Sequence, residues 1–346
     1  MRGMILAAGE GTRLRPLTYA RPKPLVPILT TPIIFHLLEW LKMHGIWEIA
    51  INNWYQPHLI EAFVRDGSAF GCSVRYLRER VPMGTAGAVR AMAPFLTEPQ
   101  EPILVVGGDE LVDVDIAEMV QFHKSRGAAV TISLAQASSP SQYGVVITDE
   151  TGRIKEFIEK PIQWSQPTAW VNSGVYLLEP FVLDLIPADQ FYDFGSQLFP
   201  RMVAEGYPVY GFYWDGFWAD IGHIETYWDA NWAALRQKIT LYHSPLRATP
   251  DHIHLHPTAD IADGAVLIPP CALGAQVVVE RGATVGPDTI IGDRSVVKSS
   301  AVIERSILWN DVTVDDGMVL CDVIVTDGCY LSGREPIRKA LIVSKR

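Results

Sequence analysis

The chain has 346 residues, of which 48% are hydrophobic and 20% are charged, and this balance excludes global disorder and provides for about two domains. Its formal net charge is -10, and lysine and arginine occur singly rather than in a basic block. A nucleic-acid partner is therefore not expected, whereas single cations beside glycine or proline suit one small anionic ligand.

The sequence also argues against export and against a membrane partner. The N-terminal residues Met1–Leu6 lack the long apolar stretch and cleavage site of a signal peptide, and no apolar run reaches the ~18 residues that span a bilayer. The four cysteines form no CxxC pair, so buried thiols in a reducing compartment are expected. We therefore expect a cytoplasmic protein.

Up to residue 241, short apolar runs alternate with amphipathic segments. This alternation predicts an α/β fold with a Rossmann-like, mixed and mostly parallel sheet covered by helices. In chain order we expect strand Met4–Ala8, helix Ile33–Met43, strand Ile46–Ile51, helix Pro57–Arg65, strand Val74–Leu77, helix Thr85–Phe95, strands Ile103–Val106, Val130–Ala135, Gly144–Ile147 and Trp170–Leu177, and helix Ile224–Arg236.

A different period begins at Leu255, where large apolar residues recur at every sixth position and small residues dominate four places after each. The large residues are Leu255, Ile261, Leu267, Leu273, Val279, Val285, Ile291, Val297, Ile303 and Trp309. An α-helix cannot keep such a stripe on one face, because each residue turns it by about 100°. A parallel β-helix can, since each six-residue step forms one side of a triangular coil with the large side chains inside. After Trp309 the phase slips, Val314 and Leu320 restart it, and a cap is expected at the end.

These patterns divide the chain into three regions. We expect an α/β domain over residues 1–241 and a linker over residues 242–251, where Ser244, Pro245 and Pro250 indicate a loop. A β-helix with its cap should follow over residues 252–346.

A glycine-containing segment, Leu6–Arg13, follows the first predicted strand. Gly9 and Gly11 let the backbone approach a ligand closely and direct amides at phosphate oxygens, and Arg13 adds a positive charge. A plain glycine-rich turn is the alternative for these residues alone. The dinucleotide fingerprint does not fit, because its third glycine position holds Leu14, and no GxxxxGK[ST] motif exists in the sequence.

The segment continues as Leu14-Arg15-Pro16-Leu17-Thr18, and Arg21-Pro22-Lys23-Pro24-Leu25-Val26-Pro27 follows. Further motifs come in order: Gly84-Thr85-Ala86-Gly87, Gly108-Asp109, Phe157-Ile158-Glu159-Lys160-Pro161, Val171-Asn172-Ser173-Gly174-Val175-Tyr176 and Trp218-Ala219-Asp220-Ile221-Gly222. Together they resemble the sugar-1-phosphate nucleotidyltransferases over essentially the whole chain. With the six-residue repeat, the chain resembles the bacterial mannose-1-phosphate guanylyltransferase branch, which implies that the tail is a left-handed parallel β-helix.

The resemblance implies a Mg²⁺-dependent transfer of a nucleoside monophosphate from a nucleoside triphosphate to a sugar 1-phosphate. It implies nucleotide binding by Leu6, Ala7, Ala8, Gly9, Gly11, Thr12, Glu79, Gly84 and Thr85. It assigns the pyrophosphate to Arg13, the triphosphate to Lys23, the sugar phosphate to Lys160, the metal to Asp109 and Asp220, and the sugar to Gly144, Glu159, Asn172 and Gly174. Relatives usually carry Asn-Gly-Asp where this chain has Gly107-Gly108-Asp109, so a side-chain amide beside the metal is missing.

Glu79 bears on the choice of base, because the family places a base-reading residue five positions before Gly84. A carboxylate only accepts hydrogen bonds, and guanine presents two adjacent donors, whereas uracil and thymine present one ring N–H flanked by acceptors. GTP is therefore favoured, although relatives that use UTP can also carry an acid here, and a surface glutamate is the alternative. Mannose 1-phosphate follows from the resemblance alone.

Several alternatives remain open. The same chemistry could use UTP or dTTP with another sugar 1-phosphate. A catalytically silent regulatory subunit is less favoured, because the charged site residues are all present. An acyltransferase is disfavoured because no histidine follows His256, and His252, His254 and His256 are expected to be solvated rather than to bind a metal. The β-helix is expected to mediate a homo-oligomer or an allosteric contact.

Overall fold

The computed structural model describes residues 1–242 and 244–344 and forms two compact units. The first unit comprises Met1–Glu10 and Leu37–Asp220, and the second comprises Gly11–His36 and Ile221–Arg346. Helix α2 (Ile33–Met43) contributes residues to both units. The domain limits expected at residues 241 and 252 stay a prediction. His243 of the expected linker and Lys345 and Arg346 of the expected cap lie outside the described residues.

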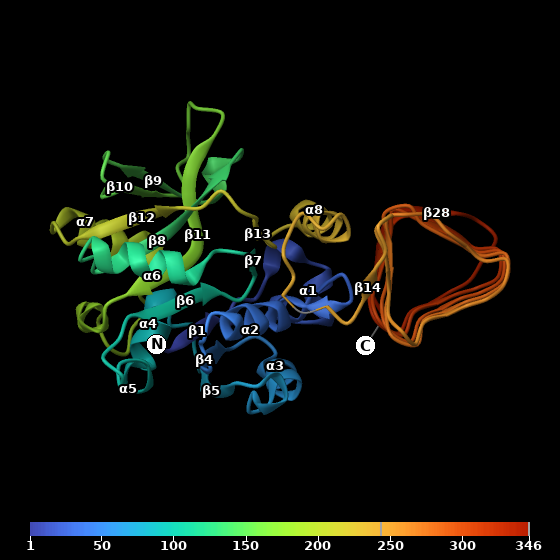
Figure 1. Cartoon of the computed structure of the whole chain (residues 1–346), viewed down its shortest axis with the longest axis horizontal. Coiled ribbons are helices and arrows are strands. Elements are labelled where there is room, and N and C mark those ends of the chain that lie inside the picture. Colours follow the sequence, from blue (N-terminus) through green and yellow to red (C-terminus); the bar gives the residue numbers. More distant parts are fainter. Residues whose placement is uncertain (243, 345–346) are drawn as a thin grey trace. The chain divides into compact units, whose positions relative to one another are not determined.

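A mixed sheet forms the centre of the first unit (Figure 1). The strands run in the order β10-β9-β11-β6-β1-β4-β5, and β8 pairs with both β11 and β12. Their bounds are β1 (Gly3–Leu6), β4 (Glu48–Asn53), β5 (Ser73–Arg78), β6 (Ile103–Gly107), β8 (Val130–Ala137), β9 (Gly144–Thr148), β10 (Ile154–Glu159), β11 (Ala169–Leu178) and β12 (Val209–Tyr213). Strand β1 is parallel to β4 and β6, whereas β11 is antiparallel to β6. The predicted α/β class with a mixed sheet is confirmed.

The α-helices of this unit are α3 (Pro57–Val64), α4 (Thr85–Ala91), α5 (Ala93–Leu96), α6 (Ile116–Ser125) and α7 (Phe199–Ala204). Its other helical segments are the 3-10 helices η3 (Ser68–Phe70), η4 (Pro140–Gln142) and η5 (Pro180–Leu185) and the π-helix η6 (Phe194–Leu198). The prediction of one helix over Thr85–Phe95 is wrong, because the helix breaks at Met92. Pro94 lacks the amide that would continue the ladder. None of the helices in the described part of the chain combines the length and the apolar character that a membrane span requires.

One face of the sheet carries a buried hydrophobic core of this unit. Ile103 and Val105 of β6 belong to a buried cluster with residues of α4, α5 and α7, whereas their neighbours Leu104 and Val106 do not. Alternate residues of a strand point to opposite faces, so these helices cover one face of the sheet. A separate two-stranded antiparallel sheet joins β7 (Glu110–Val112) to β13 (Trp218–Asp220).

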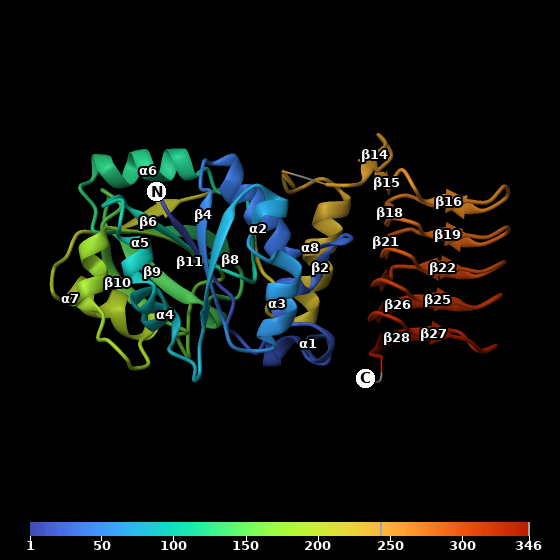
Figure 2. The same ribbon diagram turned by 90° about the horizontal axis from the view of Figure 1, so that it is seen from below.

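The second unit contains a parallel β-helix, seen end-on as a triangle in Figure 1 and as stacked coils in Figure 2. Its strands are β14 (Arg247–Ala248), β15 (Ile253–Leu255), β16 (Asp260–Ile261), β17 (Val266–Leu267), β18 (Cys271–Leu273), β19 (Val278–Val279), β20 (Thr284–Val285), β21 (Thr289–Ile291), β22 (Val296–Val297), β23 (Val302–Glu304), β24 (Ile307–Leu308), β25 (Thr313–Val314), β26 (Val319–Val325), β27 (Tyr330–Leu331) and β28 (Ile337–Ile342). The rest of the unit is η1 (Thr12–Leu14), α1 (Leu17–Ala20), η2 (Lys23–Leu25), β2 (Pro27–Ile28), β3 (Thr31–Pro32) and α8 (Ile224–Leu235). The predicted β-helix is confirmed.

The six-residue stripe ends earlier in the structure than predicted. Leu273 pairs with Ile291, but Ile291 pairs with Leu308 and not with Trp309, so one side of that coil is one residue shorter. The shortened side turns at Arg305, which has a φ of 42°. Leu308 therefore takes the inward place in the core, and the prediction that Trp309 points inward is wrong. The Trp309 indole Nε1 instead donates to the Tyr227 hydroxyl of α8 at 3.0 Å.

The three alternating histidines do not share a solvated face. His254 in β15 is buried, and its Nε2 lies 2.8 Å from the Leu235 carbonyl oxygen. His256 Nδ1 lies 2.8 Å from Thr258 Oγ1. The expectation of solvated histidines is therefore wrong for His254. Within the described part of the chain, no group of metal-ligating residues includes them.

Candidate active site

A cavity of about 460 Å³ lies at the carboxyl ends of β1 and β6 in the first unit. Many of the predicted site residues line it: Leu6, Ala8, Gly9, Glu79, Gly84, Thr85, Asp109, Glu159, Lys160, Asn172 and Gly174. Ala7, Gly144 and Asp220 belong to the same unit but are not among the lining residues. Asn52, Glu110, Tyr176 and Asp193 also line the cavity, although the sequence predicted no role for them.

The end of β1 is packed tightly against the turn after β6. The Gly108 amide donates to the Leu6 carbonyl oxygen at 2.8 Å. A Cβ on Gly108 would lie 2.7 Å from that same oxygen, which is closer than atoms can pack. Gly108 is therefore required by the close approach of two backbones, and this approach places Asp109 next to the glycine-containing segment.

Glu79 is fixed by two protein donors. Asn52 Nδ2 donates to Glu79 Oε1 at 2.6 Å, and the Met83 amide donates to Oε2 at 2.8 Å. Asn52 Oδ1 in turn accepts from the Ala7 amide at 2.9 Å. Glu79 is only 8% exposed, so the alternative of a surface glutamate is wrong. Asn52 thus links the segment after β1 to the predicted base-reading carboxylate.

The start of α4 is held by the segment that leads into η6. Thr85 Oγ1 donates to Asp193 Oδ2 at 2.8 Å and accepts from the Phe194 amide at 2.9 Å. Gly84 has a φ of 75°, and a Cβ there would lie 2.5 Å from the Tyr192 carbonyl oxygen. Gly84 and Thr85 therefore form part of the cavity wall, and the backbone at Tyr192 leaves no room for a side chain at position 84.

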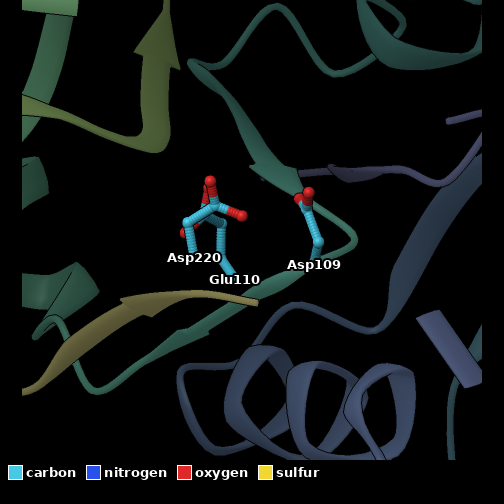
Figure 3. A group of neighbouring side chains, drawn as sticks. All are labelled: Asp109, Glu110 and Asp220. Atoms are coloured by element: carbon cyan, nitrogen blue, oxygen red, sulfur yellow. The ribbon is translucent and has the colours of Figure 1, made fainter. Parts of the chain in front are cut away.

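Three carboxylates meet where β7 pairs with β13. Asp109, Glu110 and Asp220 each offer an oxygen, and these oxygens lie within 4.8 Å of one another. Figure 3 shows Glu110 and Asp220 side by side, as expected from their pairing across the two strands, with Asp109 beside them. Glu110 Oε2 accepts from Trp218 Nε1 at 2.8 Å.

Two glycines leave room for this cluster. A Cβ on Gly107 would lie 2.9 Å from Asp109 Oδ1 and 3.0 Å from Glu110 Cγ, and a Cβ on Gly174 would lie 2.4 Å from Glu110 Oε1. The sequence resemblance predicted an asparagine at the position of Gly107. The glycine in this chain leaves space for the side chains of Asp109 and Glu110.

The predicted sugar residues lie on β9, β10 and β11. Asn172 Oδ1 accepts from the Gly174 amide at 2.9 Å, and Asn172 Nδ2 donates to the Tyr176 hydroxyl at 2.8 Å. Burial raises the pKa of Tyr176, so its hydroxyl stays protonated at neutral pH. Gly144 pairs with Glu159 across β9 and β10, and a Cβ on Gly144 would lie 2.9 Å from Glu159 Oε2.

Lys160 follows β10 directly and provides an exposed positive charge beside the predicted sugar residues. Its side chain is 60% exposed, and its Nζ lies 3.0 Å from Glu159 Oε1. The backbone at Lys160 has a φ of 45°, and its amide donates to the Tyr143 carbonyl oxygen at 3.0 Å. The lysine therefore extends from a fixed backbone into the edge of the cavity.

The remaining predicted residues, Gly11, Thr12, Arg13 and Lys23, belong to the second unit. Gly11 has a φ of 65°, and a Cβ there would lie 3.4 Å from Lys23 Cβ. Lys23 is buried, and Arg13 Nη1 lies 3.0 Å from His223 Nε2. Their part in substrate binding stays a prediction.

Comparison with known proteins settles the family. The nucleotidyl transferase family matches residues 2–237. The chain belongs to the nucleotidyl transferase family. This nucleotidyl transferase is 34% identical over 337 residues to the UTP–glucose-1-phosphate uridylyltransferase of Synechocystis sp. The aligned residues cover 94% of this chain and 87% of that protein.

Two further likenesses agree with this assignment. The nucleotidyl transferase is 34% identical over 309 residues to the mannose-1-phosphate guanylyltransferase of Mycobacterium tuberculosis, covering 87% of this chain and 82% of that protein. The crystal structure of HddC from Yersinia pseudotuberculosis complexed with GMP-PN matches with a TM-score of 0.58 and 25% identity, covering 67% of this chain and 99% of that one. The predicted enzyme class, a sugar-1-phosphate nucleotidyltransferase, is confirmed.

Proposed function

We propose that this enzyme transfers the guanylyl group of GTP to a mannose-type sugar 1-phosphate and releases pyrophosphate. The observation that carries the proposal is the cavity that contains both the buried acceptor Glu79 and the carboxylates Asp109 and Glu110. The Glu79 carboxylate suits a base with adjacent hydrogen-bond donors. The Asp109 and Glu110 carboxylates suit a cation that accompanies phosphate groups.

In the proposed reaction, an oxygen of the sugar phosphate forms a bond to the α-phosphorus of the triphosphate. The bond from that phosphorus to the oxygen bridging to the β-phosphate breaks, and pyrophosphate leaves with the electron pair. Such a transfer depends on positioning and charge neutralisation more than on covalent help. We assign the sugar phosphate to Lys160, whose exposed ammonium lies at the cavity, and the pyrophosphate and triphosphate to Arg13 and Lys23.

The acidic cluster fits Mg²⁺. Its donors are all carboxylate oxygens, which this hard cation prefers, and three of them converge from β13 and from the turn and strand after β6. Asp109, Glu110 and Asp220 would hold the ion, with Glu110 oriented by Trp218. When bound, the ion would supply positive charge to the phosphate oxygens.

The preference for guanine rests on Glu79. Each of its two oxygens already accepts one hydrogen bond from the protein. An ionised carboxylate has about four acceptor positions, so both oxygens can still accept from a ligand. Guanine offers N1–H and the 2-amino group together, and a rigid acceptor pair of this kind suits it better than a base with one ring N–H.

Uridylyl transfer to glucose 1-phosphate is the second candidate, because the Synechocystis relative bears that name and matches 94% of this chain. The side chains of Asn172 and Glu159 would provide hydrogen bonds to either pyranose. A cytoplasmic location, a homo-oligomer formed through the β-helix, and the lack of nucleic-acid and membrane partners remain predictions.

The experiment that tests the proposal is a substrate matrix. The purified chain is assayed for pyrophosphate release with each of GTP, UTP, dTTP and ATP against mannose, glucose and galactose 1-phosphates in the presence of Mg²⁺. GTP with mannose 1-phosphate should give the highest kcat/KM. Equal or better turnover with UTP or dTTP would contradict the choice of base, and a higher rate with another sugar would contradict the choice of sugar.

A further inference from the structure

The segment that carries Lys23 is attached to the β-helix by two hydrogen bonds between Arg21 and Asp327. Arg21 Nε donates to Asp327 Oδ2 at 2.7 Å, and Arg21 Nη2 donates to Asp327 Oδ1. Asp327 lies between β26 and β27 and is itself held by the Asn310 amide, which donates to Oδ1 at 3.1 Å. Two parallel bonds of this type fix orientation as well as distance.

The same guanidinium contacts the outward-facing tryptophan. The Arg21 Cζ lies 5.2 Å from the centre of the Trp309 ring, within the range of a cation–π contact. Trp309 is buried and is tied through its Nε1 to the Tyr227 hydroxyl of α8. Arg21 therefore lies against a ring whose position is set by both the coil and the helix.

The other end of the segment is also held. The Leu29 amide donates to Asn231 Oδ1 at 2.8 Å, and Asn231 Nδ2 donates to the Tyr227 carbonyl oxygen at 3.0 Å. Lys23 lies between these two anchors at the start of η2, and its carbonyl oxygen accepts from the Val26 amide at 3.1 Å. Arg21 also reaches forward to the Leu25 carbonyl oxygen at 3.4 Å, on the other side of Lys23.

We propose that Arg21 and Asp327 are positioning residues through which the β-helix holds Lys23 in its catalytic place. The inference rests on the proposed function, in which Lys23 neutralises the triphosphate. All three nitrogens of the Arg21 guanidinium already donate within the protein, two of them to Asp327 and one to the Leu25 carbonyl oxygen, so we do not assign Arg21 to the substrate. The pair is also 20% and 30% exposed, and partly solvated ion pairs contribute little to stability, so its geometry is better explained by placement of the neighbouring lysine.

The test compares ion pairs of similar geometry and exposure. Asp327→Asn and Arg21→Lys each remove the paired hydrogen bonds between Arg21 and Asp327. The control is Asp322→Asn, which breaks the Arg305–Asp322 pair within the β-helix, whose exposures are 39% and 33%. Each full-length variant is measured for melting temperature and for kcat and KM of the triphosphate, and Asp327→Asn is also made in a Lys23→Ala background.

We expect Asp327→Asn and Arg21→Lys to lower kcat about tenfold or more, since a displacement near 1 Å can cost about 100-fold, while their melting temperatures match that of Asp322→Asn. In the Lys23→Ala background, Asp327→Asn should cause no further loss, because the residue acts through the lysine. The inference would be overturned if Asp327→Asn had the same kcat as Asp322→Asn. It would also be overturned if Asp327→Asn lowered kcat as much in the Lys23→Ala background as in the wild type. Neither result would contradict the proposed function. A wild-type chain that releases no pyrophosphate would overturn the proposed function and the inference with it.

Discussion

Replacing Gly174 by alanine examines whether the Glu110 carboxylate belongs to the proposed metal site. Gly174 has a φ of 77°, and the added Cβ would lie 2.4 Å from Glu110 Oε1 and 2.9 Å from Glu110 Cδ. Ordinary contact between these atoms needs about 1 Å more. The alanine must therefore displace the Glu110 carboxylate from its place beside Trp218.

Two separate costs follow from the structure. The left-handed backbone costs an L-residue about 1–2 kcal/mol, which corresponds to a fall in melting temperature of about 2–8 °C for a unit of this size. Displacement of Glu110 should also raise the Mg²⁺ concentration for half-maximal activity about 10- to 100-fold, the usual effect of disturbing the shell of a metal site.

Gly45→Ala separates these two costs. Gly45 has a φ of 76°, and no described heavy atom beyond its chain neighbours lies within 4 Å of a Cβ placed there. The variant therefore has the same backbone strain without a collision. The assay is thermal unfolding together with pyrophosphate release over a Mg²⁺ titration. Both variants should melt at lower temperature, but only Gly174→Ala should need more Mg²⁺. An equal Mg²⁺ requirement in the two variants would refute the reasoning.

Three further predictions concern the base, the metal and pH. Glu79→Gln should lower kcat/KM for GTP about 10- to 150-fold, the equivalent of one charged hydrogen bond of about 1.5–3 kcal/mol, and lower it less for UTP. An equal loss for both triphosphates would argue against base reading. EDTA should abolish pyrophosphate release, and Asp109→Asn should raise the Mg²⁺ requirement about 10- to 100-fold; activity that survives chelation would exclude the metal. Burial lowers the pKa of His123, with Glu179 opposing it only in part, so the unfolded chain binds a proton that the folded chain does not. The free energy of unfolding should therefore fall as pH drops below 6.5, and His123→Gln should reduce that slope by up to about 1.4 kcal/mol per pH unit; an unchanged slope in urea titrations would contradict this.

The elements with a strong local period were predictable from the sequence. Helix α2 has the predicted bounds because its apolar residues repeat at helical spacing over its whole length. Strand β6 was predictable as an apolar run, and its end locates Asp109. The break between α4 and α5 was overlooked, although Pro94 marks it, because the apolar pattern continues across the break.

Glu110 shows what the sequence could not provide. It follows Asp109 directly, so a pattern of residue types treats it as one more surface carboxylate. Its burial arises from pairing with Asp220 in a strand far along the chain and from the indole of Trp218. The one local signal was glycine at position 107, where the sequence resemblance predicted asparagine and where the structure leaves space for Glu110. A departure from a motif thus pointed to an added group and not only to a missing one.

The change of period in the β-helix is a second irregularity in the sequence that marks a specific contact in the structure. The shortened coil side moves Leu308 into the core and turns Trp309 outward, toward Tyr227 and Arg21. A coil that kept the six-residue period would direct the indole inward, and Arg21 would lose its contact with the Trp309 ring. The phase slip and the Arg21-Pro22-Lys23 segment were separate features of the sequence, and they meet in one network of contacts. An irregularity in a repeat is therefore a place to look for a contact with the rest of the protein, because a residue that leaves the stripe must find other partners.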